Sequence, residues 1–464
     1  MELFVRWLFI GGLNPANSMR RSGWAVSVLA VACNVAAIEP AVILRGQTTF
    51  DVQQAQTLAT QQQPLQQLWQ QRLSVAKAQM LQSGLRANPE LMLEQTGFGS
   101  NQEREVSVGI SQKLDLFGER KTRQALASIQ LNQQHILQAR DDAELKLMVS
   151  LAYWQLAQSE WNSALVAQQQ DLSQQALLVA KKRLDAGRIA QVDYERVQLT
   201  HQGQLQKTQA AQAQHQLARG QLAQLIGGDS FVPLQLNQPM QLPAQAHLAS
   251  AEPDQQSPLQ PLLQQQIQQQ QRYADTALQL AKIQAKPQPR VSIAYVQNRE
   301  PNNPEGNRSP RVALGVSVPL ALFNKNQGAV QAQYAMQQGN DVASQWQLQQ
   351  LQQRTQQQLL SLSASTQQYQ QLTTQQLPIA QQIWRKTLLG FEAGKFTVSD
   401  VQQATRDYQQ LQAEQLALLQ QAWQLHHEIQ ALNLGISLSD VNSMLHALNQ
   451  RLSAPLATSI AQGE

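Results

Sequence analysis

Apolar residues alternate with small or polar ones in two stretches of the chain, and each stretch leads directly into a long helical pattern. The first stretch covers Gly109 to Gly118, and the second covers Gly315 to Asn324. Both reach a Leu-x-Leu-Phe sequence, and their first glycines are offset by 206 residues, as are their phenylalanines. A period of two predicts a β-strand, whereas a period of about 3.6 predicts a helix. The chain therefore contains an internal repeat in which a strand leads into a helix.

An earlier strand accompanies this one in each repeat. In the first repeat, a helical pattern stops at Asn88-Pro89, and Leu91 to Phe98 follows as a short strand. In the second repeat, an alternation of apolar with small or polar residues begins at Val291. We therefore expect strand hairpins at about 89–116 and 290–320, each apolar on one face and small or polar on the other.

These strand hairpins have two interpretations. One is a half-buried sheet in a soluble protein. The other is a transmembrane β-barrel, whose strands need about 9–11 residues with apolar side chains outside and polar ones inside. Four strands cannot close a barrel, since about eight is the practical minimum. The membrane interpretation therefore requires several chains to share one barrel, and an export signal favours it.

The export signal precedes the first helical pattern. Arg20-Arg21 is followed by an apolar run from Trp24 to Ala32 and then by small residues. This order predicts a secretory signal peptide over residues 1–37, with Met19 as a second candidate start. The run is too short to cross a bilayer as a helix, which needs about 20 apolar residues. Cys33, the only cysteine, is either a lipidation site or a residue removed with the signal peptide.

Each second strand leads into a very long helix. Seventy residues separate Phe117 from Gly187, and 71 separate Phe323 from Gly394. Either segment would extend roughly 100 Å if it were helical throughout. Small and large side chains recur every seven residues in the first segment, which is typical of a coiled coil. The predicted fold class is mixed and mainly α, with coiled-coil helical hairpins at about 117–226 and 323–434 and four β-strands per chain.

The two helical hairpins turn at related sequences. Arg183-Leu-Asp-Ala-Gly-Arg corresponds to Gly390-Phe-Glu-Ala-Gly-Lys, and Asp193 corresponds to Asp400. Glycine followed by a cation ends a helix well, because the glycine adopts a left-handed conformation and the cation meets the carbonyl end. An aspartate near the start of the returning helix favours its free N–H groups. Helix capping alone explains most of this pattern.

Composition limits the chemistry. Only 14% of the 464 residues are charged and 5% are aromatic, which suits extended helices packed through small residues. The net charge of +4 is small, and no basic cluster is interleaved with aromatic residues, so we expect no nucleic-acid partner. His426 and His427 are adjacent and diverge by about 100° on a helix. No metal-ligand spacing is present, so we expect no catalytic residue, no cofactor and no resident metal.

The doubled layout, with a glycine and a later aspartate at each tip, resembles the TolC-type outer-membrane efflux channel family over about Asp51 to Gly435. Asn88-Pro89-Glu90-Leu91 and Leu114-Asp-Leu-Phe-Gly-Glu-Arg-Lys121 are similar to the subgroup that works with heavy-metal resistance–nodulation–division (RND) pumps. The resemblance implies a homotrimer in outer-membrane lipid, whose twelve strands form one barrel continued by a helical tunnel through the periplasm. It also implies an inner-membrane RND pump and a periplasmic membrane-fusion adaptor.

The implied function is passive conduction of a substrate to the exterior, with divalent heavy-metal cations as the first candidate. Drug efflux or type I secretion is the alternative within the same class. A periplasmic coiled-coil scaffold without a pore is the alternative from another class. The implied layout is a signal peptide (1–37), a first repeat (38–226), an irregular equatorial segment (227–261), a second repeat (262–435) and a C-terminal equatorial tail (436–464).

The resemblance also implies site residues, by position. A pore constriction is expected at Asp400 and Gln403, and closure between the hairpins is expected at Asp193, Phe391 and Phe396. The adaptor is expected to dock on the hairpin tips, at Ala186, Gly187, Arg188, Ala393, Gly394 and Lys395. The chain departs from the family pattern because Phe396 and Gln403 stand where other members carry an Arg and a second Asp. The departure argues against the salt bridge between the hairpins and against a double acidic ring, and we expect a single ring with a weaker cation preference.

Overall fold

A computed structural model describes residues 51–98, 103–227, 241–243, 260–299, 310–436, 438 and 441–453. The chain divides into two compact units, Met1–Glu39 and Pro40–Glu464, and all the described residues belong to the second. The predicted signal peptide, with Met19 and Cys33, lies outside the described residues. Most of the predicted irregular segment 227–261 does so too.

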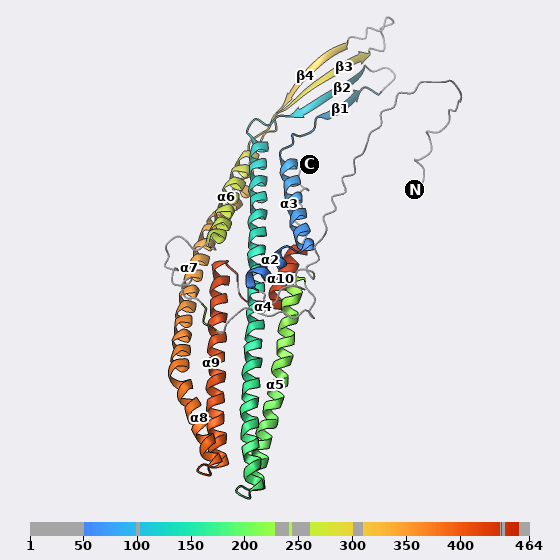
Figure 1. Ribbon diagram of the computed structural model, residues 1–464. Coiled ribbons are helices and arrows are strands. Elements are labelled where there is room, and N and C mark those ends of the chain that lie inside the picture. Colours follow the sequence, from blue (N-terminus) through green and yellow to red (C-terminus); the bar gives the residue numbers. More distant parts are fainter. Residues whose placement is uncertain are drawn as a thin grey trace, which may run out of the picture. The chain divides into compact units, whose positions relative to one another are not determined.

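Four strands form one antiparallel sheet in chain order (Figure 1). They are β1 (Glu90–Thr96), β2 (Arg104–Lys113), β3 (Arg290–Arg299) and β4 (Pro310–Ser317). Within each repeat the two strands pair as a hairpin. The two hairpins are joined by β2 and β3, which pair from Arg104 opposite Arg299 to Lys113 opposite Arg290. β1 and β4 are therefore the edge strands of the described sheet.

One face of the sheet is apolar and exposed. Cross-strand pairing places the apolar residues in continuous rows, and their side chains are 43–78% exposed. Two such rows are Leu91, Ile110, Ile293 and Leu314, and Leu93, Val108, Tyr295 and Val312. Every strand contributes to each row, so the sheet presents an uninterrupted apolar surface.

The other face carries mostly small and polar residues, and its strands approach closely. Gly109 lies opposite Ala294, and Gly315 lies opposite Ser292. A Cβ added to Gly109 would lie 2.7 Å from the Cβ of Ala294, and one added to Gly315 would lie 2.6 Å from the Oγ of Ser292. Both separations are shorter than real Cβ contacts. The crowding requires glycine at Gly109, where a backbone carbonyl also stands in the way, whereas at Gly315 the nearest atom is a hydroxyl that can rotate.

The first helical hairpin consists of α4 (Glu119–Asp185) and α5 (Gln191–Ile226). α4 begins directly after β2 because Gly118 adopts a left-handed conformation with φ of +79°. The carboxylate of Asp115 then accepts hydrogen bonds from the backbone N–H groups of Glu119 (2.7 Å) and Arg120 (3.0 Å). These bonds satisfy two of the free donors at the helix start. α4 continues without a break for 67 residues.

The second helical hairpin is built differently on its outgoing side. The chain runs through α7 (Gln327–Gln371), a π-helical turn, η2 (Leu372–Gln376), and α8 (Leu377–Glu392) before it returns as α9 (Val398–Asn433). The sequence repeat alone predicts one long helix here. The interruption falls at Pro378, which has no N–H to donate and whose ring clashes with the carbonyl group four residues earlier.

Four further helices pack beside these hairpins: α2 (Val52–Thr60), α3 (Gln63–Ser83), α6 (Gln260–Gln284) and α10 (Val441–Ser453). Pro64 stands in the first turn of α3, which explains why the helical pattern after Asp51 forms two helices rather than one. The largest apolar cluster joins side chains of α2, α3, α4, α5, α9 and α10. Arg451 of α10 also forms ion pairs with the carboxylates of Asp141 and Glu144 on α4.

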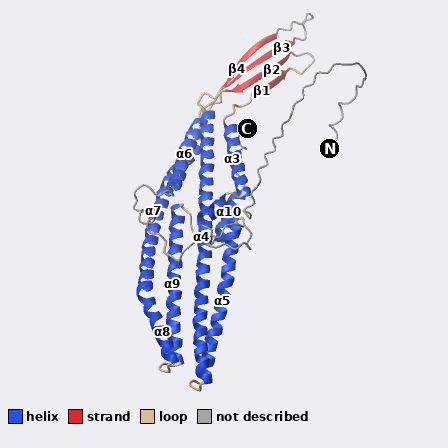
Figure 2. Cartoon of the chain, in the orientation of Figure 1, coloured by secondary structure: helices blue, strands red, loops and turns tan. Residues whose placement is uncertain are grey.

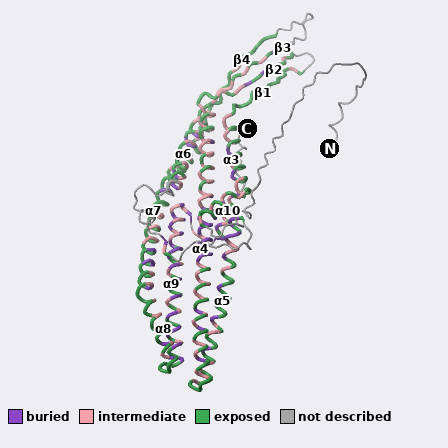
Figure 3. The backbone as a smooth tube through the Cα atoms, viewed as in Figure 1, coloured by how far each residue is buried: buried purple, intermediate pink, exposed green. Residues whose placement is uncertain are grey.

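The fold is therefore mainly helical with a four-stranded antiparallel sheet, as expected from the sequence (Figure 2). Figure 3 shows that buried residues gather where the helices meet, whereas the hairpin tips and most of the sheet are exposed or partly exposed. Of the helices within the described ranges, none combines the length and apolar character needed to cross a bilayer.

Candidate functional site

The tips of both helical hairpins end in the same backbone motif. The N–H of Gly187 bonds to the carbonyl of Leu184 (2.8 Å), and the N–H of Arg188 bonds to the carbonyl of Arg183 (2.8 Å). In the second hairpin, Gly394 and Lys395 make the corresponding bonds to Phe391 (3.0 Å) and Gly390 (2.7 Å). Both glycines have positive φ, 67° and 81°. This is the Schellman termination, which satisfies carbonyl groups left free at a helix end.

The six tip residues that the sequence singles out are all exposed: Ala186, Gly187, Arg188, Ala393, Gly394 and Lys395. The two alanines are the C-cap residues of α4 and α8, and the glycines and cations follow them. Each tip therefore presents a backbone turn and one cation to solvent.

The returning helices begin differently. Thr397 is the N-cap of α9, and its hydroxyl accepts a hydrogen bond from the N–H of Asp400, whose carboxylate accepts one from the N–H of Thr397 (2.8 Å). This capping box lowers the pKa of Asp400 through the hydrogen bonds from Thr397. Ala190 takes the N-cap position of α5 and offers no such side chain, and Asp193 instead lies 3.9 Å from the guanidinium of Arg196.

Gln403 and Asp400 lie one turn apart on an exposed part of α9. The amide of Gln403 donates to the carboxylate of Asp407 (2.7 Å) and accepts from the guanidinium of Arg406 (2.8 Å). Gln403, which stands at the position where the family resemblance implies a second Asp, thus links Asp407 and Arg406 on α9.

The two hairpins meet near their tips through Arg183. Its guanidinium donates to the carbonyl of Phe391 (2.7 Å) and, at 3.4 Å, to that of Phe396. The same group lies 4.4 Å from the centroid of the Phe391 ring. Phe391 is itself 1% exposed and belongs to an apolar cluster with Ala180 of α4 and Val197 of α5. We call this contact the Arg183 latch.

Phe396 packs against the end of α8. A Cβ added to Gly390 would lie 2.3 Å from a ring carbon of Phe396, so this glycine makes room for the ring. The structure therefore brings two of the predicted closure residues, Phe391 and Phe396, together with Arg183. The carboxylate of Asp193 pairs within its own helix.

Buried polar and aromatic contacts continue the hairpin interface away from the tips. The amide of Gln204 on α5 donates to Gln169 on α4 (3.4 Å), which donates to Gln412 on α9 (3.3 Å). Farther along, the rings of Trp154 and Trp423 stack with centroids 3.4 Å apart. These contacts fix the register between the first hairpin and α9.

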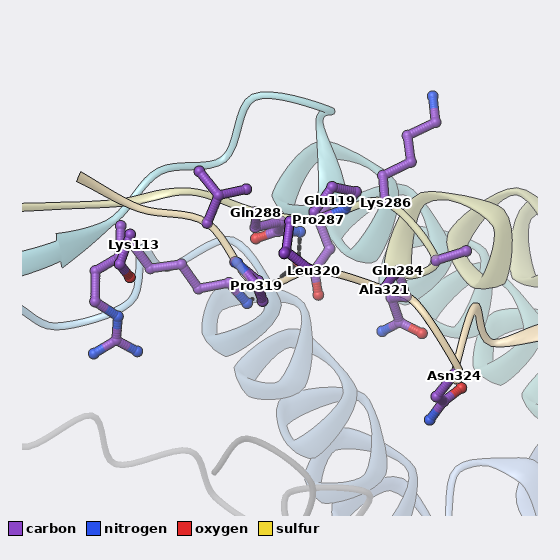
Figure 4. Close-up of a pocket in the computed structure, with 14 residues that line it drawn as sticks. Lys113, Glu119, Gln284, Lys286, Pro287, Gln288, Pro319, Leu320, Ala321 and Asn324 are labelled. Atoms are coloured by element: carbon purple, nitrogen blue, oxygen red, sulfur yellow. Dashed lines mark hydrogen bonds and ion pairs between the residues drawn. The ribbon is translucent and has the colours of Figure 1, made fainter.

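A pocket of about 640 Å³ lies at the other end of α4, where the sheet meets the helices (Figure 4). Glu119 lies in it within 3.7 Å of the Lys113 amine and accepts a hydrogen bond from the amide of Gln288. Lys286 extends away from this group, and its amine lies 5.1 Å from the ring centroid of Phe117. Lys113 and Gln288 thus both contact Glu119, and we interpret the pocket as the junction between β2, β3 and α4 rather than as a ligand site.

The described residues form no candidate metal centre. No group of three or more His, Cys, Asp or Glu side chains among the described residues is placed to hold an ion. His426 and His427 are adjacent on α9, and the buried His427 bonds through Nδ1 to the carbonyl of Trp423 (2.7 Å). The second of these rings is thus part of the packing.

Sequence reasoning missed Arg183, Gly390 and the π turn. Arg183 and Gly390 could have been noticed in the sequence. They occupy corresponding positions in the two tip sequences, and the two residues differ strongly there. Where both hairpins need the same backbone turn, the sequences agree. Where one hairpin contacts the other, the two copies must differ.

No protein-family model matches the sequence, and no curated protein does. Solved structures do match. The outer membrane protein VceC from Vibrio cholerae superimposes with a TM-score of 0.65 at 15% identity, over 84% of this chain and 97% of that one. CusC gives 0.63 at 16% identity, over 82% and 90%. The open state of the MtrE outer membrane channel of Neisseria gonorrhoeae gives 0.56 at 18%, over 84% and 90%. These matches establish a fold shared with TolC-type outer-membrane channels.

Proposed function

We propose that a chain with this fold is one subunit of a trimeric outer-membrane efflux channel, which conducts substrate passively from a periplasmic adaptor and an inner-membrane pump to the exterior. The proposal assigns no catalytic step and no cofactor to the chain. The observation that carries it is the sheet, because one face is a continuous exposed apolar surface and the other carries mostly small and polar residues. A barrel wall between lipid and water requires that division.

The sheet's edges support the oligomer. β1 and β4 are edge strands in the described sheet, and an unpaired edge in lipid leaves backbone groups without hydrogen bonds. Pairing β4 of one subunit with β1 of the next satisfies them. Three copies supply twelve strands, enough to close a barrel, and the same symmetry turns three pairs of helical hairpins into a tunnel.

The tips are the proposed gate. In the trimer, Asp400 and Gln403 of three copies line a constriction, and the Arg183 latch holds the second hairpin against the first in the closed state. The adaptor docks on the exposed turns at Gly187 and Gly394. Divalent heavy-metal cations are the proposed substrate class, on the strength of the Asn88 and Leu114 motifs. Drug efflux or type I secretion is the alternative.

The decisive experiment combines localisation with conductance. The full-length protein, expressed in a Gram-negative host, is expected in the outer-membrane fraction as a trimer that dissociates only on heating, and the purified trimer is expected to form ion channels in planar bilayers. The scaffold alternative predicts a soluble periplasmic protein without conductance, and that result would overturn the proposal. Resistance of a pump-bearing host to zinc, cobalt or cadmium salts, compared with resistance to lipophilic drugs, separates the substrate classes.

A further inference from the structure

We propose that the π turn before Pro378 is the pivot on which α8 and its tip swing when the Arg183 latch opens. This inference rests on the proposed gate, and it adds the place where the chain bends. Its basis is an asymmetry between the repeats. α4 is unbroken over 67 residues, whereas its counterpart is divided into α7, η2 and α8.

The local chemistry makes this point weaker than the helix around it. Pro378 cannot donate to the carbonyl of Thr374, and its ring crowds that carbonyl. The chain responds by widening one turn, Leu372–Gln376, to π geometry, which takes up an extra residue. Breaks of this kind are where helices kink, because the ladder of backbone hydrogen bonds is already interrupted. The corresponding stretch of α4 contains no proline.

The π turn contacts the rest of the protein through Leu372 and Thr373. Leu372 is 3% exposed and is the buried residue of the turn. The hydroxyl of Thr373 accepts a hydrogen bond from the amide of Gln415 on α9 (3.0 Å). Thr374 bonds back to the carbonyl of Gln370 (2.8 Å). The Gln415 bond ties the pivot to α9, and Gln375 and Gln376 are exposed.

Beyond the pivot, α8 packs closely against α9 and makes far fewer contacts with α4 of the first hairpin. Trp384 stacks with Tyr408 of α9, with centroids 6.2 Å apart, and Phe391 sits in the latch. Two large apolar side chains of α8, Ile383 and Leu389, are 53% and 65% exposed. From Pro378 to Gly394 this segment is about 24 Å long, so a bend of about 20° moves the tip by about 8 Å. That displacement is large enough to part three converging tips.

The test removes the pivot. Deleting Gln375 in a Pro378→Ala chain restores a regular α-helix and keeps the later residues of α8 facing α9, and Pro378→Ala alone is a second variant at full length. Spin labels on Lys182 and Lys386 report the separation of the tips; labels on Glu160 and Gln349 report the separation above the pivot. All four positions are exposed. Asp171→Ala is the control for Pro378→Ala, because Asp171 lies at the corresponding position of the first repeat, on the unbroken helix α4.

Releasing the latch with Arg183→Gln is expected to lengthen the Lys182–Lys386 distance and leave the Glu160–Gln349 distance unchanged. In the repaired helix the same release is expected to lengthen the tip distance by less than half as much. Equal lengthening of both distances, or the same lengthening with and without the pivot, would overturn the pivot. These distances can be measured whether or not the trimer conducts ions, so planar-bilayer recordings of the same variants test the proposed function separately.

Discussion

The guanidinium of Arg183 on the first helical hairpin donates a 2.7 Å hydrogen bond to the carbonyl of Phe391 on the second, and it lies 4.4 Å from the centroid of the Phe391 ring. A cation at the carbonyl end of a helix is favoured by the helix dipole as well as by the bond itself. The contact thus joins the hairpins without a carboxylate. Asp193 takes no part in this contact, because its carboxylate pairs with Arg196 on its own helix.

Arg183→Gln is expected to favour the open tip. A hydrogen bond to a charged group contributes about 1.5–3 kcal/mol, so its loss shifts a closed–open equilibrium by roughly 10–150-fold. The measurement is single-channel conductance and open time of the purified trimer in planar bilayers, where longer openings are expected. Arg188→Gln is the matched control, because Arg188 is an exposed arginine just beyond the end of α4. Equal effects of the two substitutions would contradict the latch.

The backbone of this architecture follows from the sequence, because strand and helix periods are local properties. The alternation around Gly109 predicts β2, and the long uninterrupted pattern after Phe117 predicts α4. The latch does not follow, since Arg183 and Phe391 are 208 residues apart and meet only when two hairpins pack. The π turn was not foreseen either, although Pro378 marks it. The helix Val441–Ser453 lies inside the stretch predicted only as a tail.

Gly109→Val is expected to prevent assembly of the sheet. Its Cβ would lie 2.7 Å from the Cβ of Ala294 and 2.8 Å from the carbonyl oxygen of Ile293, and neither can move without disturbing the β2–β3 pairing. Heat-modifiable trimer on a gel is the measurement, and its loss is the expected outcome. Gly203→Ala is the control: a Cβ there meets nothing within 4 Å, and alanine favours a helix by about 1 kcal/mol over glycine. A normal amount of Gly109→Val trimer would remove the crowding argument.

His427 is expected to make the helical region less stable in mild acid. Burial lowers the pKa of this ring to about 4 from 6.5, against the opposing effect of its bond to the Trp423 carbonyl. The folded state therefore favours the neutral ring, and its stability is fully present above pH 6.5 and falls as the pH drops towards 4. The loss at the lower end is on the order of 3 kcal/mol.

Urea unfolding followed by tryptophan fluorescence at pH 7 and pH 5 measures this effect, because the stacked Trp154 and Trp423 lie beside the ring. His427→Gln is expected to reduce the difference between the two pH values. His446→Gln on α10 is the control, since that ring is on a different helix and bonds to the exposed Gln450. An unchanged pH dependence in His427→Gln would show that other groups cause it.

Asp400 has two expected roles, and three substitutions separate them. Its carboxylate completes the capping box of α9 with Thr397, and in the proposed trimer it also lines the constriction. The hydrogen bonds from Thr397 lower the pKa of this carboxyl, and three copies of it in the proposed trimer would attract cations. Asp400→Ala removes both the cap and the charge. Thr397→Ala removes the capping hydroxyl and leaves the charge, and Asp193→Ala removes the equivalent acid of the first hairpin, which has no capping box.

If the charge controls conduction, Asp400→Ala raises single-channel conductance or relieves block by divalent cations at least severalfold, while Thr397→Ala and Asp193→Ala do not. Hydrogen exchange at the first turn of α9 is expected to quicken in both Asp400→Ala and Thr397→Ala, because each loses a bond that holds the helix start. Equal conductance changes in those two variants would assign the effect to the cap instead of the ring. An unaltered conductance in Asp400→Ala would remove Asp400 from the constriction.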